Sequence, residues 1–399
     1  MSDQITIRVP SSRPFRRHLA LDYHDTPIRL AQARLTGRRV LTPALDLSSY
    51  TCRAVLDWTT IEVELARSTQ LQHIRRVIED ATGQSVWVKP LTSNPGGVDT
   101  RFALTLQEPT LREICDYKVL LENAFGLVSD PTMAGLEVSV DFYPRKPDDA
   151  ARSRLVAVLS RHLAPKRDVL NYHLDNPRFA WGTGPTKTSR AWMAPSTAAT
   201  GDFLRDVHGD QMIPYDATFY LGAKFSALSW RVMDKVLDRQ NKKTGTARHL
   251  PDNEKRARVE VTLSQSELAK RGIRSIDDLL RHDWLTMQGD YFGFYLPTFN
   301  ARETSSIADR YWEPHRLTRF LNAGLVGLDA MDRQQARDRK SIRADVRKHF
   351  LGTSKRLPPL PRNGRGSAGT TIAYAELNER IRTALGNMQE REHRLVRGK

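Results

Sequence analysis

Carboxylates recur on one side of short alternating segments of this chain. Glu137 and Asp141 share the polar side of the segment 136–142, whose other side is apolar. Glu260 lies in the same way in the segment 258–263. Side chains of a β-strand alternate between its two faces, so these acids meet on one surface if their strands are neighbours. Glu62 and Glu64 of the segment 58–65 are placed alike, and such hard oxygen ligands suit Mg²⁺ or Mn²⁺.

Basic residues accompany these acids. Arg231 and Lys235 share one side of the segment 230–235. A bound metal would polarise a phosphodiester and offset its developing charge, while these two cations hold the phosphate as catalytic residues. Further contacts to DNA are predicted at four basic residues: Lys224, Lys242, Lys243 and Arg258. The alternative is an antiparallel sheet with one solvated polar face and no chemistry on it.

Other catalytic signatures are absent from the sequence. No two histidines form a His-x-His pair, and the run GTGPTKT at 182–188 lacks the spacing of a P-loop, so we interpret it as a loop. Cys52 and Cys115 are the only cysteines, which excludes a disulfide framework or a thiolate zinc site and favours a reducing cytoplasm. The first thirty residues lack the pattern of a signal peptide, and no stretch is apolar enough to span a membrane.

The charge of the chain points to a polyanionic partner. It has 399 residues, enough for a core without metal clips, and 62 Lys and Arg against 46 Asp and Glu, a net charge of +16. Such a balance favours nucleic acid, DNA or RNA, or an anionic membrane surface. Cations are concentrated after Asp329, where they could bind phosphates through counterion release or simply be solvated.

The pattern of apolar residues predicts an α+β fold. Alternation predicts strands at 58–65, 101–106, 136–142, 218–221, 228–235 and 256–263. Helical spacing predicts helices near 70–82, 110–125, 152–163 and 266–282. We expect an antiparallel β-sheet core with helices on one face, two similar α/β halves, and a helical, basic C-terminal extension.

Composition suggests where these units begin and end. We expect a basic N-terminal arm at 1–45, ordered only in part, and a core at 46–300 with halves at about 46–170 and 215–300. A connection rich in Gly and Pro joins the halves at 174–214. Three segments follow the core: a helical segment at 301–354, a linker at 355–369 and a basic C-terminal helix at 370–399.

Four motifs together resemble one family. They are LDWTTIEVEL at 56–65, LEVSVDFYP at 136–144, TFYLGAKFSALSWRVMDKVLDRQNKK at 218–243 and ARVEVTLSQSELAKRGIRSIDDLL at 257–280. In order and approximate spacing they are similar to the motifs of the Rep_trans-type rolling-circle replication initiators of plasmids and phages. Gly222, Ser226, Arg231 and Lys235 fall on matching positions.

The resemblance implies a mechanism. In that family a tyrosine attacks one DNA strand at the replication origin and becomes linked to its 5′ phosphate, with help from a metal that acidic residues bind. Asp141 and Glu260 match those acids and Glu137 stands where aspartate is usual, so the resemblance implies a divalent-metal site at Glu137, Asp141 and Glu260. Met233 stands where the family has its tyrosine, and a thioether cannot attack phosphorus. Tyr220 and Tyr143 are the nearest replacements by motif.

Two functions therefore stay open. The first is a DNA-binding replication initiator of a plasmid, prophage or other mobile element that nicks one strand with Mg²⁺ or Mn²⁺. The second is a catalytically inactive origin-binding or regulatory protein that recruits the replication machinery. An RNA-binding module is a third, weaker reading, since basic charge does not distinguish the two polymers. A helicase is the expected protein partner, no membrane is involved, and a homodimer is left open.

Overall fold

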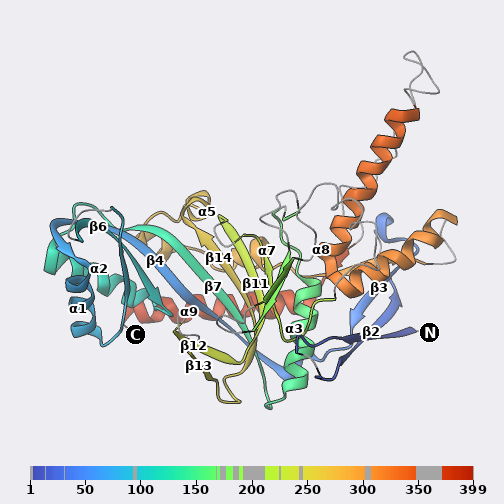
Figure 1. Cartoon of the computed structure of the whole chain (residues 1–399), viewed down its shortest axis with the longest axis horizontal. Coiled ribbons are helices and arrows are strands. Elements are labelled where there is room, and N and C mark those ends of the chain that lie inside the picture. Colours follow the sequence, from blue (N-terminus) through green and yellow to red (C-terminus); the bar gives the residue numbers. More distant parts are fainter. Residues whose placement is uncertain are drawn as a thin grey trace.

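Two antiparallel sheets organise the chain (Figure 1). The computed structural model describes residues 3–13, 15–30, 32–92, 97–167, 169–170, 177–182, 188–191, 212–223, 226–241, 246–301, 307–346 and 371–398. The larger sheet has nine strands in the order β5-β6-β4-β7-β14-β11-β10-β8-β9, and the smaller has five in the order β1-β2-β3-β15-β16. The α+β class with an antiparallel core is therefore confirmed.

The first half of the large sheet is a β-α-β-β-α-β unit. Its elements are β4 (Tyr50–Gln70), α1 (Leu71–Thr82), β5 (Trp87–Pro90), β6 (Val98–Gln107), α2 (Leu111–Phe125) and β7 (Thr132–Pro144). Ile61, Val63 and Leu65 of β4 are buried against the helices, as their alternation predicts. Thr110 and Glu113 form a capping box that fixes the start of α2.

The second half follows a different order. Its strands are β8 (Arg178–Trp181), β9 (Thr188–Ala191), β10 (Thr218–Leu221), β11 (Leu228–Lys235) and β14 (Arg256–Ser264), with a separate hairpin of β12 (Leu237–Asn241) and β13 (Thr246–His249). Three short helices then follow: α5 (Gln265–Lys270), α6 (Ile276–Arg281) and α7 (Thr286–Tyr291). The two halves thus differ in element order, yet pairing of β7 with β14 joins them in one sheet. Of the connection at 174–214, the structure describes β8, β9 and the last few residues.

The apolar face of the sheet lies against helices. Val138 and Val140 of β7 are fully buried, and α3 (Asp149–His162) contacts β7, β11 and β14. Asp148 begins α3 by accepting hydrogen bonds from the backbone amides of Ala150 and Ala151. The alternate residues of the same strands are polar and lie on the opposite face, where the predicted site residues belong.

The expectation of a partly ordered N-terminal arm is wrong. Residues 3–43 form β1 (Asp3–Val9), β2 (Leu19–Pro27) and β3 (Arg38–Pro43), which pair with one another and with β15 (Tyr295–Asn300). Val9, Leu21 and Tyr23 are buried there. The Arg and Pro content conceals this alternation, and the pairing partner β15 lies far away in the sequence. Two short 3₁₀ turns, Ala33–Leu35 and Leu47–Ser49, complete this region.

The C-terminal region is helical, as expected. α8 (Ile307–Val346) bends sharply at Gly324, and β16 (Thr371–Ala373) leads into α9 (Ala375–Arg397). The helix α9 packs under β4 and beside α2, with Leu377, Ile381 and Leu385 fully buried, so it belongs to the core. The linker at 355–369 lies outside the described residues. Among the described helices, none carries an apolar stretch long enough to cross a membrane.

Candidate functional site

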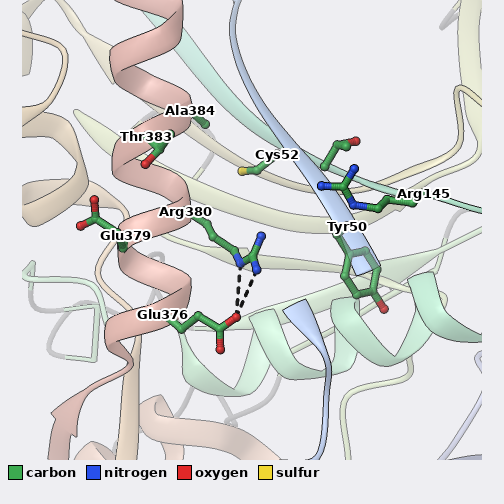
Figure 2. A pocket seen from close by; sticks show the side chains of 9 residues that line it. Tyr50, Cys52, Arg145, Glu376, Glu379, Arg380, Thr383 and Ala384 are labelled. Atoms are coloured by element: carbon green, nitrogen blue, oxygen red, sulfur yellow. Dashed lines mark hydrogen bonds and ion pairs between the residues drawn. The ribbon is translucent and has the colours of Figure 1, made fainter. Parts of the chain in front are cut away.

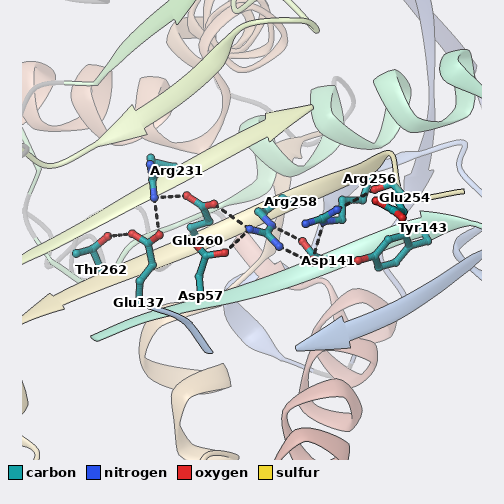
Figure 3. Close-up of polar contacts among 10 residues, drawn as sticks. All are labelled: Asp57, Glu137, Asp141, Tyr143, Arg231, Glu254, Arg256, Arg258, Glu260 and Thr262. Carbon is teal, nitrogen blue, oxygen red and sulfur yellow. Dashed lines mark hydrogen bonds and ion pairs between the residues drawn. The ribbon is translucent and has the colours of Figure 1, made fainter. Parts of the chain in front are cut away.

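Three carboxylates meet on the polar face of the large sheet (Figure 3). Asp57 of β4, Glu137 of β7 and Glu260 of β14 each place an oxygen within 4.8 Å of the others, and we call these three residues the acidic cluster. β7 and β14 pair so that Glu137 lies opposite Thr262 and Glu260 opposite Ser139. The structure therefore brings together two of the three predicted metal ligands.

The third acid, Asp57, was not predicted. The pairing of β4 with β7 shifts between Leu56 and Trp58, which leaves Asp57 as the extra residue of a β-bulge. A bulge interrupts the alternation of faces and re-aims one side chain, here toward Glu137 and Glu260. The only signal in the sequence was a lone aspartate before the tryptophan of LDWTTIEVEL, because a bulge depends on the partner strand.

Arg231 of β11 closes the acidic cluster from the next strand. It lies directly opposite Glu260, and its Nη2 contacts Glu137 Oε1 at 2.6 Å and Glu260 Oε2 at 2.5 Å. The Arg231 side chain is 33% exposed, whereas those of Glu137 and Glu260 are 2% and 3% exposed. Arg231 is thus the most exposed side chain of the site, and an incoming phosphate would meet it before the acids.

The acidic cluster carries more negative charge than its surroundings offset. Burial, together with the neighbouring Glu260, raises the pKa of Glu137 to about 8. Burial also raises the pKa of Glu260. For Asp57 burial is the largest single effect and acts in the same direction. The Arg258 guanidinium, a hydrogen bond shared with the Glu137 carboxyl group and the charges of Lys235 and Arg231 together outweigh it and lower the pKa of Asp57. At neutral pH one proton therefore stays on Glu137.

This donor set fits a divalent metal. Carboxylate oxygens are hard ligands, and Mg²⁺ or Mn²⁺ binds a few of them while keeping several waters. A buried acid that retains its proton at neutral pH marks surplus negative charge, and a cation can replace that proton. Lys235 also acts on the site, since its charge adds to the lowering of the Asp57 pKa and offsets part of the increase in the Glu260 pKa.

Asp141 is not part of the acidic cluster, contrary to the prediction. Arg258 donates to both of its oxygens, from Nε at 2.5 Å and from Nη2 at 2.7 Å, and Arg256 Nε lies 3.0 Å from Oδ2. Asp141 shares a face with Glu137, but four residues of strand separate them by about 13 Å, which is too far for one metal ion. The spacing of four residues along one strand already implies this separation, so a shared face was not sufficient ground for a shared metal site.

Of the four predicted DNA contacts, only Arg258 lies within the described residues. Arg258 is 1% exposed, and its guanidinium pairs with Asp57 and Asp141, so a direct contact to DNA phosphate is contradicted. Its pKa is raised even though burial lowers it, because these acids stabilise its charge. The other three predicted contacts, Lys224, Lys242 and Lys243, lie outside the described residues.

The structure separates the two candidate tyrosines. Tyr220 of β10 lies opposite Arg231, in the same row across the sheet as Glu260, about 10 Å away over two strand spacings. The Arg178 guanidinium lies 4.9 Å from the centre of the Tyr220 ring. Tyr143 instead donates to Asp141 Oδ2 at 3.3 Å, outside the acidic cluster.

Met233 lies on the polar face, as its spacing from Arg231 predicts. Its partner across the strand pair is Arg258, one row from the Arg231–Glu260 row. Of the two candidate tyrosines, Tyr143 has its pKa raised to about 12 by burial, which disfavours its phenolate. Tyr220 is therefore the candidate nucleophile nearer the acidic cluster by register.

A separate cavity of about 550 Å³ lies between the start of β4 and α9 (Figure 2). Tyr50, Cys52 and Arg145 line one side, and Glu376 and Arg380, which form an ion pair at 3.2 Å, line the other. Burial raises the pKa of the Cys52 thiol, so it is not a ready nucleophile. None of the acidic cluster lines this cavity.

Known proteins add no assignment to this geometry. No model of a known protein family matches the chain, and no curated protein matches it by sequence. The likeness to the Rep_trans-type initiators therefore rests on the four short motifs and on what the site itself can do.

Proposed function

We propose that this protein is a DNA-binding replication initiator of a plasmid, prophage or other mobile element, and that it nicks one strand at an origin with Mg²⁺ or Mn²⁺. One observation carries the proposal: Asp57, Glu137 and Glu260 lie within 4.8 Å of one another beside the partly exposed Arg231. A net charge of +16 supports a nucleic-acid partner. The free cysteines Cys52 and Cys115 suit a reducing cytoplasm.

Each residue has a distinct task in this proposal. Asp57, Glu137 and Glu260 hold the metal, which when bound polarises the scissile phosphate. Arg231 binds a phosphate oxygen through its exposed edge. Tyr220 Oη attacks phosphorus and gives up its proton, the bond from phosphorus to the 3′ oxygen breaks, and that oxygen leaves as a hydroxyl after gaining a proton. The phosphotyrosine bond then conserves the energy needed to rejoin the strand.

A second function is favoured by a different observation. Met233 occupies the position at which the resembled family has its tyrosine, and Arg231 already bonds to two of the three acids. Both features suit a protein that has kept DNA binding and lost nicking. Such a protein would mark the origin and recruit a helicase or a separate nickase.

The test is a cleavage assay on supercoiled DNA that carries the region around this coding sequence, with Mn²⁺ present. The initiator predicts nicked circles and a covalent protein–DNA adduct that survives denaturation. Glu260→Gln abolishes both, Tyr220→Phe abolishes the adduct, and Tyr143→Phe leaves both intact. The matched control Glu62→Gln changes an acid of β4 on the same face, outside the acidic cluster. Binding without nicked circles or adduct would assign the second function instead.

A further inference from the structure

The polar face of the large sheet continues past the acidic cluster onto β6 and β5. Trp87 of β5 is 69% exposed, while its neighbour Val88 is 2% exposed and faces the core. Lys89 and Arg101 are exposed on the same side as Trp87. The helices α1 and α2 contact the strands from the buried side, beside β4 and β6 in Figure 1, and leave this side open.

Register connects Trp87 to the acidic cluster. Trp87 pairs with Thr105, and Thr105 pairs with Thr60, their hydroxyls 2.7 Å apart. Trp58 precedes Thr60 by two residues on β4, so the two side chains share a face. Trp58 pairs directly with Glu137 of β7. Two tryptophans therefore lie along a line of about 15 Å, three strand spacings, that ends at the metal ligands.

The ring of Trp58 lies against Gly135 of β7. A Cβ at Gly135 of β7 would come within 2.9 Å of Trp58 Cζ3, so the ring covers the backbone of that glycine. Only glycine allows so close an approach. Trp58 is half-buried, so this contact restrains the ring while part of it stays accessible to a nucleobase.

The chemistry of this face selects its occupant. Every nucleobase has a flat surface that stacks on tryptophan, and bases of a single strand are free to do so, whereas those of a duplex already stack on one another. Lys89, Arg101 and Arg231 can follow the phosphates along the face. Glu62 and Glu64 lie across from Ala103 and Arg101 and offset part of this charge, which favours contact through bases over contact through phosphates alone.

We propose that the open face of β5, β6 and β4 binds single-stranded DNA by stacking bases on Trp87 and Trp58, and that this track delivers the strand to Arg231 and the acidic cluster. The destination of the strand rests on the function proposed above. The stacking itself does not, because it needs neither metal nor nucleophile.

The test is fluorescence anisotropy with labelled oligodeoxythymidine in EDTA, which removes any metal. Trp87→Ala should weaken binding about 5- to 150-fold, the range for loss of one stacked base, and Trp87→Phe should retain most of the affinity. Val119→Ala, at an exposed residue of α2, should bind as the unaltered protein does. The melting temperatures of the three variants should match, since Trp87 is mostly exposed.

Equal affinity of Trp87→Ala and the unaltered protein would overturn the track, even if Glu260-dependent nicking occurs. Conversely, Trp87-dependent binding without nicking would leave the track standing and contradict the enzyme. Oligouridine is the comparison ligand, and tighter binding of oligouridine than of oligodeoxythymidine would also overturn the proposal, because it would make RNA the occupant. Duplex DNA should show no dependence on Trp87.

Discussion

Arg231 bonds to Glu137 and Glu260 at once, although the three residues come from three strands. The strand order β7-β14-β11 makes this possible, because Glu260 lies between the other two. The same guanidinium offsets the charge of the acids and faces solvent. The site is thus prepared for an anion on its outer side and a cation among its carboxylates.

Replacing Arg231 should show how much its positive charge stabilises the buried acids Glu137 and Glu260. In Arg231→Gln the two buried acids lose their cation, so the free energy of unfolding at pH 8 should fall by about 1–3 kcal/mol, less than for a fully buried pair because Arg231 is partly exposed. Mn²⁺ should restore more stability to this variant than to the unaltered protein. Urea denaturation with and without Mn²⁺ measures both effects, and an equal gain from Mn²⁺ in the two proteins would argue against competition for the same oxygens.

Glu137 should make the protein less stable as pH rises. Its pKa is raised to about 8 from an ordinary value of 4.5, so between these values the folded chain holds a proton that the unfolded chain has lost. Unfolding free energy therefore decreases from pH 5 to 8 on account of this group. Glu137→Gln, which mimics the protonated acid, should be more stable than the unaltered protein at pH 8, by on the order of 1 kcal/mol. If Glu137→Gln lost as much unfolding free energy between pH 5 and pH 8 as the unaltered protein does, the assignment to Glu137 would be refuted.

His162 should make the protein less stable as pH falls, the opposite of the effect of Glu137. It is fully buried, its Nδ1 donates a hydrogen bond to the carbonyl oxygen of Tyr295, and burial lowers its pKa to about 4 from 6.5. Between these values the unfolded chain binds a proton that the folded chain does not, so stability falls as pH decreases, by about 1.4 kcal/mol per pH unit. His162→Phe suits the surrounding rings of Tyr23 and Phe320 and should reduce that slope. Denaturation curves at pH 6 and 4.5 test this, and parallel losses in both proteins would rule it out.

The bend of α8 should depend on Gly324. Its φ is +67°, and a Cβ there would lie 2.6 Å from the backbone of Arg161. Gly324→Ala should therefore destabilise the fold by about 2 kcal/mol or more, from a strained backbone and a steric clash. Gly289→Ala is the matched control, because nothing lies within 4 Å of its added methyl group. Similar losses in the two variants would show that the close approach to Arg161 does not limit this position.

The sequence predicted those parts of the structure that depend on local alternation. The β7 and β14 segments place Glu137 and Glu260 on one polar face, as their spacing indicates. Asp57 could not be predicted, because its bulge arises only when β4 pairs with β7. Asp141 shares that face but lies four residues, about 13 Å, from Glu137 along the strand, and its pairing with Arg258 depends on the register of β7 with β14, which alternation does not fix. The N-terminal sheet was missed because β3 pairs with β15, which follows it by some 250 residues.

The acidic cluster is tested most directly by Mn²⁺ binding, measured by calorimetry or by electron paramagnetic resonance on the full chain without DNA. The structure predicts one Mn²⁺ per chain, lost in Glu260→Gln and in Asp57→Asn, and retained in Glu62→Gln. No bound Mn²⁺ in the unaltered protein, or equal binding in all four proteins, would contradict a metal site at Asp57, Glu137 and Glu260.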